Sequence, residues 1–372
     1  FAEGSGTYVN YSGRDHEALS GEDIEASWKN TLASDPDSVW DTTIGEVNQE
    51  YAIFNFGPNN EVGIARLAKN TSISDTVGSD GSYNHQESTT YQAYGFDPKT
   101  NQSTLQLVKE VDHNGNGKID DVKDVSGNYF EKTEGKGTSI SHSGRDGSAT
   151  LFDFFKPGTN LGDLTDDQRR SLRDNATNTA QDNEKLFWDT TNTTTSTDYV
   201  DPKNVFNQLK VNTQTTNSVT RSRDGSQNIQ NNVVTYKYGQ TPVSNDTSLT
   251  DGKRWNFENN GALLVGAYGK GDFVQDDGNG NLTTGLTEQR YAITRGQRAQ
   301  LGESTSISNS SSSDGGVSHQ LSTVLYHYNS KGRLDSSKPA EGYSASFSID
   351  GDGNITNSGV IGKKSSGETT GF

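Results

Sequence analysis

The chain has 372 residues and a net charge of −17, from 32 Lys and Arg against 49 Asp and Glu. Binding to nucleic acid or to an anionic membrane surface needs a cationic footprint, so this composition argues against both kinds of partner. Because the chain contains no cysteine, disulfides, thiol catalysis and Cys-ligated zinc are excluded.

Apolar residues are scarce. Only 28% of the chain is Ala, Val, Ile, Leu, Met, Phe, Trp, Tyr or Cys, and adding the 41 glycines leaves the share below the roughly 45–50% of typical globular domains. Thin β-layers, an elongated shape or burial in an assembly fit better than one thick core. The longest apolar run, from Ala262 to Ala267, is far shorter than the ~20 residues of a transmembrane helix, so no membrane span is expected. A chain that begins at Phe1 is interpreted as a processed or excised form.

The first predicted element is a short helix. Ser20 is followed three residues later by Asp23, which is the spacing of a capping box at a helix N-terminus. The helical pattern ends at a Trp-Asp-Thr-Thr sequence that starts at Trp40. We interpret this indole as a core anchor, with stacking on a sugar ring as the alternative.

Four β-hairpins are predicted, each with a Ser/Thr-rich strand, an Asp-Gly turn and a returning strand that carries aromatic residues. Glycine is suited to these turns because it adopts the positive φ that a tight connection between twisted strands requires. In the third hairpin, Tyr236 and Tyr238 are two residues apart, so their rings are expected on one face of the strand. The turns are Asp80-Gly81, Asp146-Gly147, Asp224-Gly225 and Asp314-Gly315.

A stretch between the first two hairpins, DHNGNGKIDD, has the pattern of a calcium loop. Oxygen-bearing side chains on alternate residues and a glycine at the bend allow a short loop to surround one hard cation. The stretch resembles the calcium loops of EF-hand and dockerin-type proteins, although Lys123 stands where those loops carry an acidic residue. A plain Asn-Gly turn is the alternative. The predicted Ca²⁺ ligands are Asp112, Asn114, Asn116 and Asp120.

The second half of the chain repeats the plan of the first. Thr165 and Gln168 have the capping-box spacing. A second Trp-Asp-Thr-Thr begins at Trp188, and its indole is interpreted in the same way as that of Trp40, as a core anchor with sugar stacking as the alternative. Two further Gly/Asn/Asp loops, 277–281 and 350–354, lack the full calcium pattern and are predicted to be structural turns.

The predicted fold is therefore mainly β, as two tandem divergent copies of a β-hairpin-rich module, each with one short capped helix, elongated overall. The copies are expected at 1–160 and 161–331. The tail, 332–372, is expected to contribute strands that start a further partial repeat.

No catalytic motif is recognisable. The six histidines are separate in sequence, and the spacings of zinc hydrolases, serine hydrolases and phosphate-binding loops are absent. The leading hypothesis is a non-enzymatic extracellular structural protein, a calcium-stabilised subunit of a bacterial surface filament or layer that self-associates into a polymer. In composition the chain is similar to the outer β-domains of flagellar hook proteins and flagellins, and to surface-layer and adhesin modules. The long heptad-patterned terminal helices of intact flagellins and hook proteins are missing.

Two alternatives to this hypothesis stay open. The first is an adhesin that binds glycans or another cell-surface partner through its hairpin loops, and the second is a secreted polysaccharide-cleaving enzyme. An adhesin would carry exposed aromatic side chains on one face, whereas an enzyme would need a cleft with two converging carboxylates.

Overall fold

The computed structural model describes residues 2–13, 39–56, 62–78, 80–97, 102–112, 130–145, 161–239, 262–294, 298–329, 332–338 and 340–362. The chain divides into two compact units. Unit 1 consists of residues 1–96, 112–194 and 220–223, and unit 2 of residues 97–111, 195–219 and 224–372.

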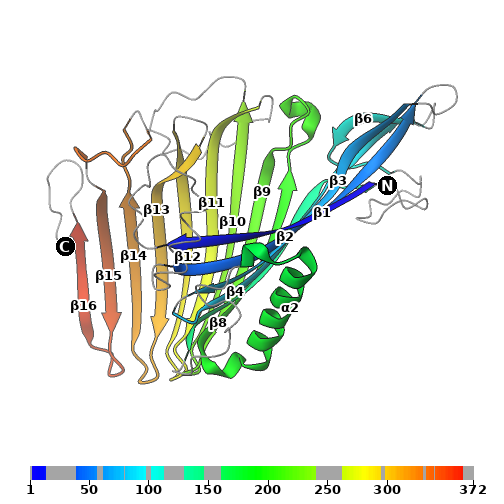
Figure 1. Ribbon diagram of the computed structural model, residues 1–372. Helices are drawn as coiled ribbons and strands as arrows, with labels where there is room; N and C mark the ends of the chain where they lie inside the picture. The colour runs from blue at the N-terminus through cyan, green and yellow to red at the C-terminus, as the bar shows by residue number, and fades with distance from the viewer. Residues whose placement is uncertain are drawn as a thin grey trace. The chain divides into compact units, whose positions relative to one another are not determined.

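The described residues are mainly β, as predicted (Figure 1). The large sheet has the strand order β1-β2-β3-β4-β7-β8-β9-β10-β11-β12-β13-β14-β15-β16, and β5 pairs with β6 in a small separate sheet. Most sheet neighbours are thus neighbours along the chain, as expected where short turns connect antiparallel strands. The strands of the first half are β1 (Ala2–Gly13), β2 (Val39–Phe56), β3 (Val62–Gly78), β4 (Tyr83–Tyr91), β5 (Ala93–Asp97), β6 (Gln102–Val108) and β7 (Glu134–Arg145). Those of the second half are β8 (Phe187–Tyr199), β9 (Val211–Ser222), β10 (Gln227–Gly239), β11 (Leu263–Asp276), β12 (Leu282–Thr294), β13 (Arg298–Ser311), β14 (Val317–Leu325), β15 (Glu341–Ile349) and β16 (Ile355–Gly362).

Three of the four predicted Asp-Gly hairpins are confirmed. They connect β3 with β4, β9 with β10, and β13 with β14. At the three turns Gly81, Gly225 and Gly315 have φ of 80°, 91° and 87°, which is the backbone conformation that favours glycine. The second predicted turn, at Asp146-Gly147, lies outside the described residues.

The helix predicted after Thr165 is α2 (Asp166–Asp182), and it is the α-helix of the described part of the chain. The Thr165 side chain accepts a hydrogen bond from the Gln168 backbone, and the Gln168 side chain accepts one from the Thr165 backbone, so the capping box is complete. Asp166 and Asp167 in the first turn are favourable to the helix dipole. The first predicted helix, at 20–38, lies outside the described residues. Short 3₁₀ helices are η3 (Leu161–Asp163), η4 (Glu184–Leu186) and η5 (Pro202–Val205).

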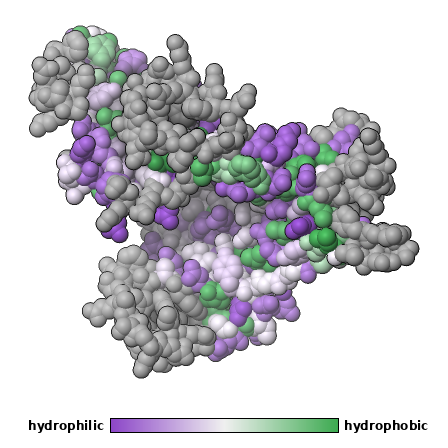
Figure 2. Space-filling view, turned by 90° about the horizontal axis from the view of Figure 1, so that it is seen from above, coloured by the Kyte–Doolittle hydropathy of each residue, from purple (hydrophilic) through white to green (hydrophobic). Residues whose placement is uncertain are grey.

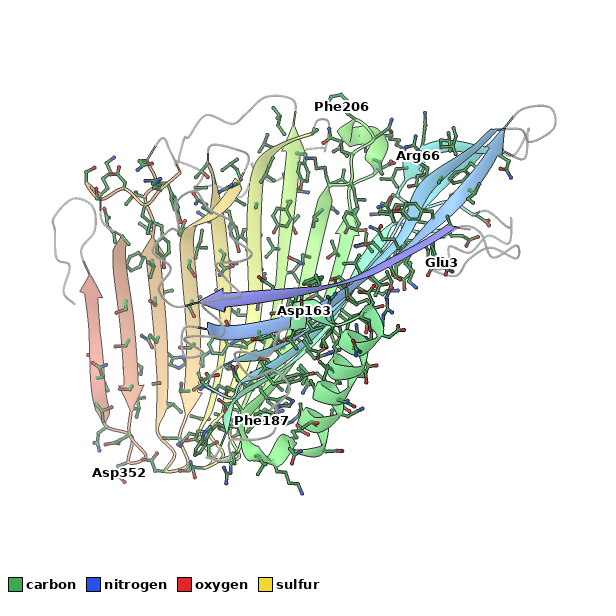
Figure 3. The ribbon with its side chains drawn as sticks, in the orientation of Figure 1. Glu3, Arg66, Asp163, Phe187, Phe206 and Asp352 are labelled. Atoms are coloured by element: carbon green, nitrogen blue, oxygen red, sulfur yellow. The ribbon has the colours of Figure 1, made fainter. Side chains whose placement is uncertain are left out.

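The core of unit 1 lies between α2 and the sheet. Ala176 and Ala180, one turn apart on the helix, are fully buried and pack with Ile44 of β2 and Tyr83 of β4. Phe187, which begins β8 close to the end of the helix (Figure 3), belongs to the same cluster. Small side chains on the helix allow it to lie close to the sheet, so this thin layer is enough to bury a core.

In unit 2, strands β10 to β16 each pair antiparallel with the next strand (Figure 1). This unit has a small hydrophobic core, which consists of Val200, Val205, Tyr238 and Leu264. Tyr236 packs against the same cluster as Tyr238, in line with the expectation that both rings lie on one side of β10.

The interpretation of the Trp-Asp-Thr-Thr indoles as core anchors is wrong for Trp188, which is 53% exposed. Side chains alternate along a strand, and in β8 the buried position is taken by Phe187, whose ring stacks on His142 at a centroid distance of 4.5 Å. Trp188 therefore points to the other side. The side chain of Trp40 lies outside the described residues.

In the view of Figure 2, the described residues form a mixed surface in which hydrophilic residues alternate with smaller groups of hydrophobic ones. Within the described residues, no helix has both the length and the apolar character required to cross a membrane.

Candidate functional site

One of the four predicted calcium ligands lies within the described residues. Asp112 is described and half-buried, whereas Asn114, Asn116 and Asp120 lie outside the described residues. Within the described residues, no three His, Asp or Glu side chains are grouped so that they could hold a metal ion. Calcium binding at 112–120 therefore stays a prediction.

The two weaker loops form hydrogen-bonded turns that connect β11 with β12 and β15 with β16. In the β11–β12 turn, the Asp277 carboxylate accepts hydrogen bonds from the backbone amides of Asn279 (2.8 Å) and Asn281 (3.1 Å). In the β15–β16 turn, Asp350 accepts corresponding bonds from Asp352 (3.0 Å) and Asn354 (2.8 Å); Asp352 is labelled in Figure 3. These bonds lower the pKa of both aspartates and close the turn by themselves.

Beneath α2 in unit 1 lies a cluster of buried polar side chains that the sequence did not reveal. The carboxylate of Asp75 in β3 has no exposed surface. Its Oδ1 accepts hydrogen bonds from the Tyr83 hydroxyl and from the Thr177 hydroxyl at 3.1 Å, and lies 2.8 Å from His85 Nδ1. Its Oδ2 lies 3.8 Å from Arg173 Nε. The cluster thus joins two strands of a hairpin to the helix above them.

Two titratable neighbours of Asp75, His85 and Tyr83, have raised pKa values. The hydrogen bond to Asp75 raises the pKa of His85, against the effect of burial. Burial, followed by the charge of Asp75, raises the pKa of the Tyr83 hydroxyl, which therefore stays protonated and donates. An Asp-His-Tyr cluster can store and exchange a proton, but here its oxygen and nitrogen atoms hold one another and the helix.

A second buried link joins strand β2 to α2. Glu46 of β2 accepts a 2.6 Å hydrogen bond from Arg173 Nη1 and a 2.9 Å bond from Arg170 Nε. The side chains of Glu46 and Arg173 are 8% and 10% exposed. Burial alone would raise the pKa of Glu46, but the bonds from Arg173 and Arg170 outweigh it, so the pKa is lowered and the carboxylate stays charged.

The same side-chain contacts occur within two groups of three strands. We call β2, β3 and β4 the N-triplet, and β12, β13 and β14 the C-triplet. Both triplets have a bulge beside a Gln-x-Tyr sequence, where the tyrosine hydroxyl donates to the glutamine: Tyr51 to Gln49 (2.7 Å) and Tyr291 to Gln289 (2.8 Å). Both have a threonine pair across the second and third strands. The pairs are Thr71–Thr89 (3.1 Å) and Thr305–Thr323 (3.0 Å).

Further contacts fix which residues correspond. A tyrosine after the third strand donates to a leucine carbonyl of the second strand in both triplets; the bonds are Tyr94 to Leu67 (2.7 Å) and Tyr328 to Leu301 (2.8 Å). A hydroxyl pair, Thr43–Thr76 (2.8 Å) or Thr283–Ser310 (2.8 Å), lies near the Asp-Gly turn. A third such pair, Thr191–Thr220 (2.8 Å), joins β8 to β9. These contacts match the first hairpin with the fourth, whereas two tandem copies at 1–160 and 161–331 would match the first with the third. The boundaries of the two copies stay a prediction.

The two faces of β10–β16 in unit 2 differ in chemistry. Residues directly opposite each other on paired strands share a face, so the registers place Leu286, Ile307, Leu321 and Ala345 in one row across four strands. We call the side with this row the apolar face. The opposite face carries mostly Ser, Thr, Gln and Gly, such as Ser306 and Ser322.

The apolar face is exposed. Leu286 and Ile307 are each 48% exposed. This face carries all the large hydrophobic side chains that are exposed on the described strands of unit 2. They are Val233, Val274, Leu282, Leu286, Ile307, Val317, Tyr343, Phe347 and Ile355. An exposed apolar surface of this kind marks a contact site more often than a solvated surface.

Comparison with known proteins gives no assignment: no protein family profile and no curated protein matches the sequence. The geometry of the described residues is therefore the basis for a functional proposal.

Proposed function

We propose that this chain is a non-enzymatic structural subunit of a bacterial filament or layer outside the cell. The observation that carries the proposal is the recurrence of one set of strand-locking contacts in the N-triplet and the C-triplet. The repeated side chains connect strands to one another, as expected where a module is reused as a building block.

Composition supports the same proposal. A chain with few apolar residues and a net charge of −17 cannot rely on a thick hydrophobic core. Such a chain can gain stability from partners that bind its folded state. Ca²⁺ at Asp112 and further copies of the chain are the partners we propose. The buried Asp75–His85 cluster is covered by α2, so we assign it to holding the helix on the sheet and not to catalysis.

Electron microscopy of native material, together with light scattering of the purified chain, tests this function. We expect particles that grow with protein concentration, as filaments or sheets, and that become more stable when calcium is present. A monodisperse monomer at every protein and calcium concentration, with no ordered assembly in native material, would contradict the proposal.

A glycan-binding adhesin is the second candidate, because Trp188 is exposed. The Arg223 guanidinium lies 5.3 Å from the centre of its indole ring, and a Cβ added at Gly144 would meet the ring at 3.0 Å. The ring is thus held in place on unit 1, as an aromatic platform for a sugar would be. Binding to a glycan panel that is lost in Trp188→Ala and kept in Phe206→Ala, which removes another exposed aromatic ring, would favour this candidate.

A further inference from the structure

The apolar face of unit 2 corresponds to the face that α2 covers in unit 1. The N-triplet register places Ile44 opposite Asp75, and Asp75 opposite His85. The C-triplet register places Thr284 opposite Asn309, and Asn309 opposite His319. His319 is hydrogen-bonded to Asn309 just as His85 is to Asp75. The same face is therefore covered by a helix in one triplet and exposed in the other.

The two carboxylates that hold α2, Asp75 and Glu46, are replaced by uncharged residues in the C-triplet, Asn309 and Leu286. Where the N-triplet has the row Glu46–Ile73–Glu87, the C-triplet has Leu286–Ile307–Leu321. Leu286 thus replaces the carboxylate that binds Arg170 and Arg173. A helix that attaches through arginines would find no carboxylate partner on the C-triplet, whereas another apolar surface could pack on its Leu286–Ile307–Leu321 row.

The width of the apolar face fits a sheet better than a helix. Seven strands about 4.8 Å apart, with about seven residues per strand, give a face of roughly 34 by 24 Å, or about 800 Å². A helix with its side chains is only about 10 Å wide. An interface of standard size buries about 800 Å² on each partner, so a second sheet packed about 10 Å away would cover this face completely.

The distribution of charge on the face is that of a protein interface. Charged side chains lie toward β11 and β12, at Lys270, Asp272 and Glu288, whereas the rows across β13 to β15 are uncharged around Ile307. An uncharged centre with a charged margin is typical of protein contacts. Asn309 and His319 between the apolar rows argue against lipid as the occupant, because buried polar groups need hydrogen-bonding partners.

We propose that the apolar face of one copy packs on the same face of a second copy. This inference rests on the proposed structural function and names the surface through which the chain associates. The face is self-complementary in this arrangement: an uncharged centre meets an uncharged centre, and both charged margins stay at the solvent-accessible rim.

Ile307→Lys tests the contact, with Ser306→Lys as the matched control. Ile307 lies at the centre of the face and is exposed in the single chain, so a lysine there leaves the monomer folded, which a thermal unfolding curve will confirm. Ser306 is its neighbour on the opposite face. By sedimentation equilibrium, Ile307→Lys should weaken association by about 100-fold or more, since two unpaired ammonium groups would be buried per contact. Ser306→Lys should associate like the unmodified chain.

A second measurement does not depend on a disruptive substitution. Because the chain has no cysteine, Ile307→Cys and Ser306→Cys each introduce a single thiol. Alkylation by a maleimide should slow with rising protein concentration at position 307 and stay constant at position 306.

The outcomes separate this inference from the proposed function. Equal association of the Ile307→Lys variant and the unmodified chain would overturn the surface and leave the structural function standing. A monomer at all concentrations, in both purified and native material, would overturn both. Binding of the monomer to phosphatidylcholine vesicles that Ile307→Lys abolishes would identify lipid as the occupant and overturn the proposed contact between copies.

Discussion

Nδ1 of His85 lies 2.8 Å from Oδ1 of Asp75, a carboxylate with no exposed surface, in the layer between the β3–β4 hairpin and α2. At the corresponding place in the C-triplet, His319 meets the uncharged amide of Asn309. The charged member of the first pair is the one that also binds the helix, through Thr177. A titrating group and a helix attachment are thus combined at one position of unit 1.

Stability of unit 1 should depend on pH through His85. Because the pKa of His85 is raised in the folded state by Asp75, its contribution is complete below the ordinary value of 6.5 and is lost as the pH rises through the folded-state pKa. Urea unfolding between pH 5.5 and 9 should show this decline in the unmodified chain. His85→Gln should remove it, and His319→Gln, next to an uncharged partner, should not.

His142 should act in the opposite direction. Burial lowers its pKa, so the neutral imidazole is the form that the folded state accepts, with Nδ1 2.9 Å from the Thr190 hydroxyl. Its effect is a loss of stability as the pH falls below 6.5. If His142→Asn leaves the acid side of the stability profile of the chain unchanged, this assignment is wrong.

Removal of Glu46 should weaken the attachment of the helix to the sheet. Glu46→Ala leaves the buried guanidinium of Arg173 without its 2.6 Å partner, and breaking a buried pair in this way costs about 3 kcal/mol of unfolding free energy. Glu50→Ala is the control on the same strand, because its pair with Lys69 is 21–30% exposed and should cost less than about 1 kcal/mol. If urea unfolding shows the same loss of unfolding free energy for Glu46→Ala and Glu50→Ala, Glu46 does not attach the helix to the sheet.

Calcium should stabilise the chain through Asp112. At a free calcium concentration about 100 times the dissociation constant, binding to the folded state alone adds about 2.7 kcal/mol. The Tm should therefore rise with calcium and fall with a chelator, and Asp112→Ala should abolish the difference. Asp277→Ala is the matched control, because the Asp277 oxygens already accept the backbone bonds of their own turn. That variant should lose the same stability with and without calcium.

Local signals predicted the elements, and long-range contacts were beyond them. Thr165 with Gln168 marks the start of α2 because a capping box is complete within four residues. The Asp75–His85 pair could also have been inferred, since a hairpin centred on Asp80-Gly81 places these two residues opposite each other. Glu46 and Arg173 meet only after the helix returns to the sheet, and a single sequence has no signal for that contact.

The side that a residue occupies was harder to predict than the strand itself. Alternation predicts that Leu282, Thr284 and Leu286 share a face of β12, but it does not say whether a helix, a second sheet or solvent covers that face. Trp188 shows the same limit. Two adjacent aromatic residues in β8 compete for the buried side, and Phe187 takes it.

Reversing the charges of the Arg290–Glu303 ion pair should give the C-triplet the same order of charges as the N-triplet. Beside the bulge of each triplet, an ion pair crosses from the first strand to the second: Glu50–Lys69 at 2.8 Å, and Arg290–Glu303 at 3.3 Å with the charges reversed. Arg290→Glu places two carboxylates opposite each other and should cost about 0.5–1 kcal/mol, since both side chains are partly solvated. Adding Glu303→Lys recreates the order of the N-triplet and should restore most of that loss.

The double variant is informative because the two positions correspond only if the triplets are built alike. Arg298→Glu, at an exposed site on β13, changes the net charge equally and should show no recovery when combined with Glu303→Lys. The recovery should also shrink in 1 M salt, where charges are screened within about 3 Å. Urea unfolding of the unmodified chain, of Arg290→Glu, of Glu303→Lys and of the double variant gives the coupling energy directly. A coupling near zero at low salt would mean that the bulge geometry, and not the pairing of charges, is what the two triplets share.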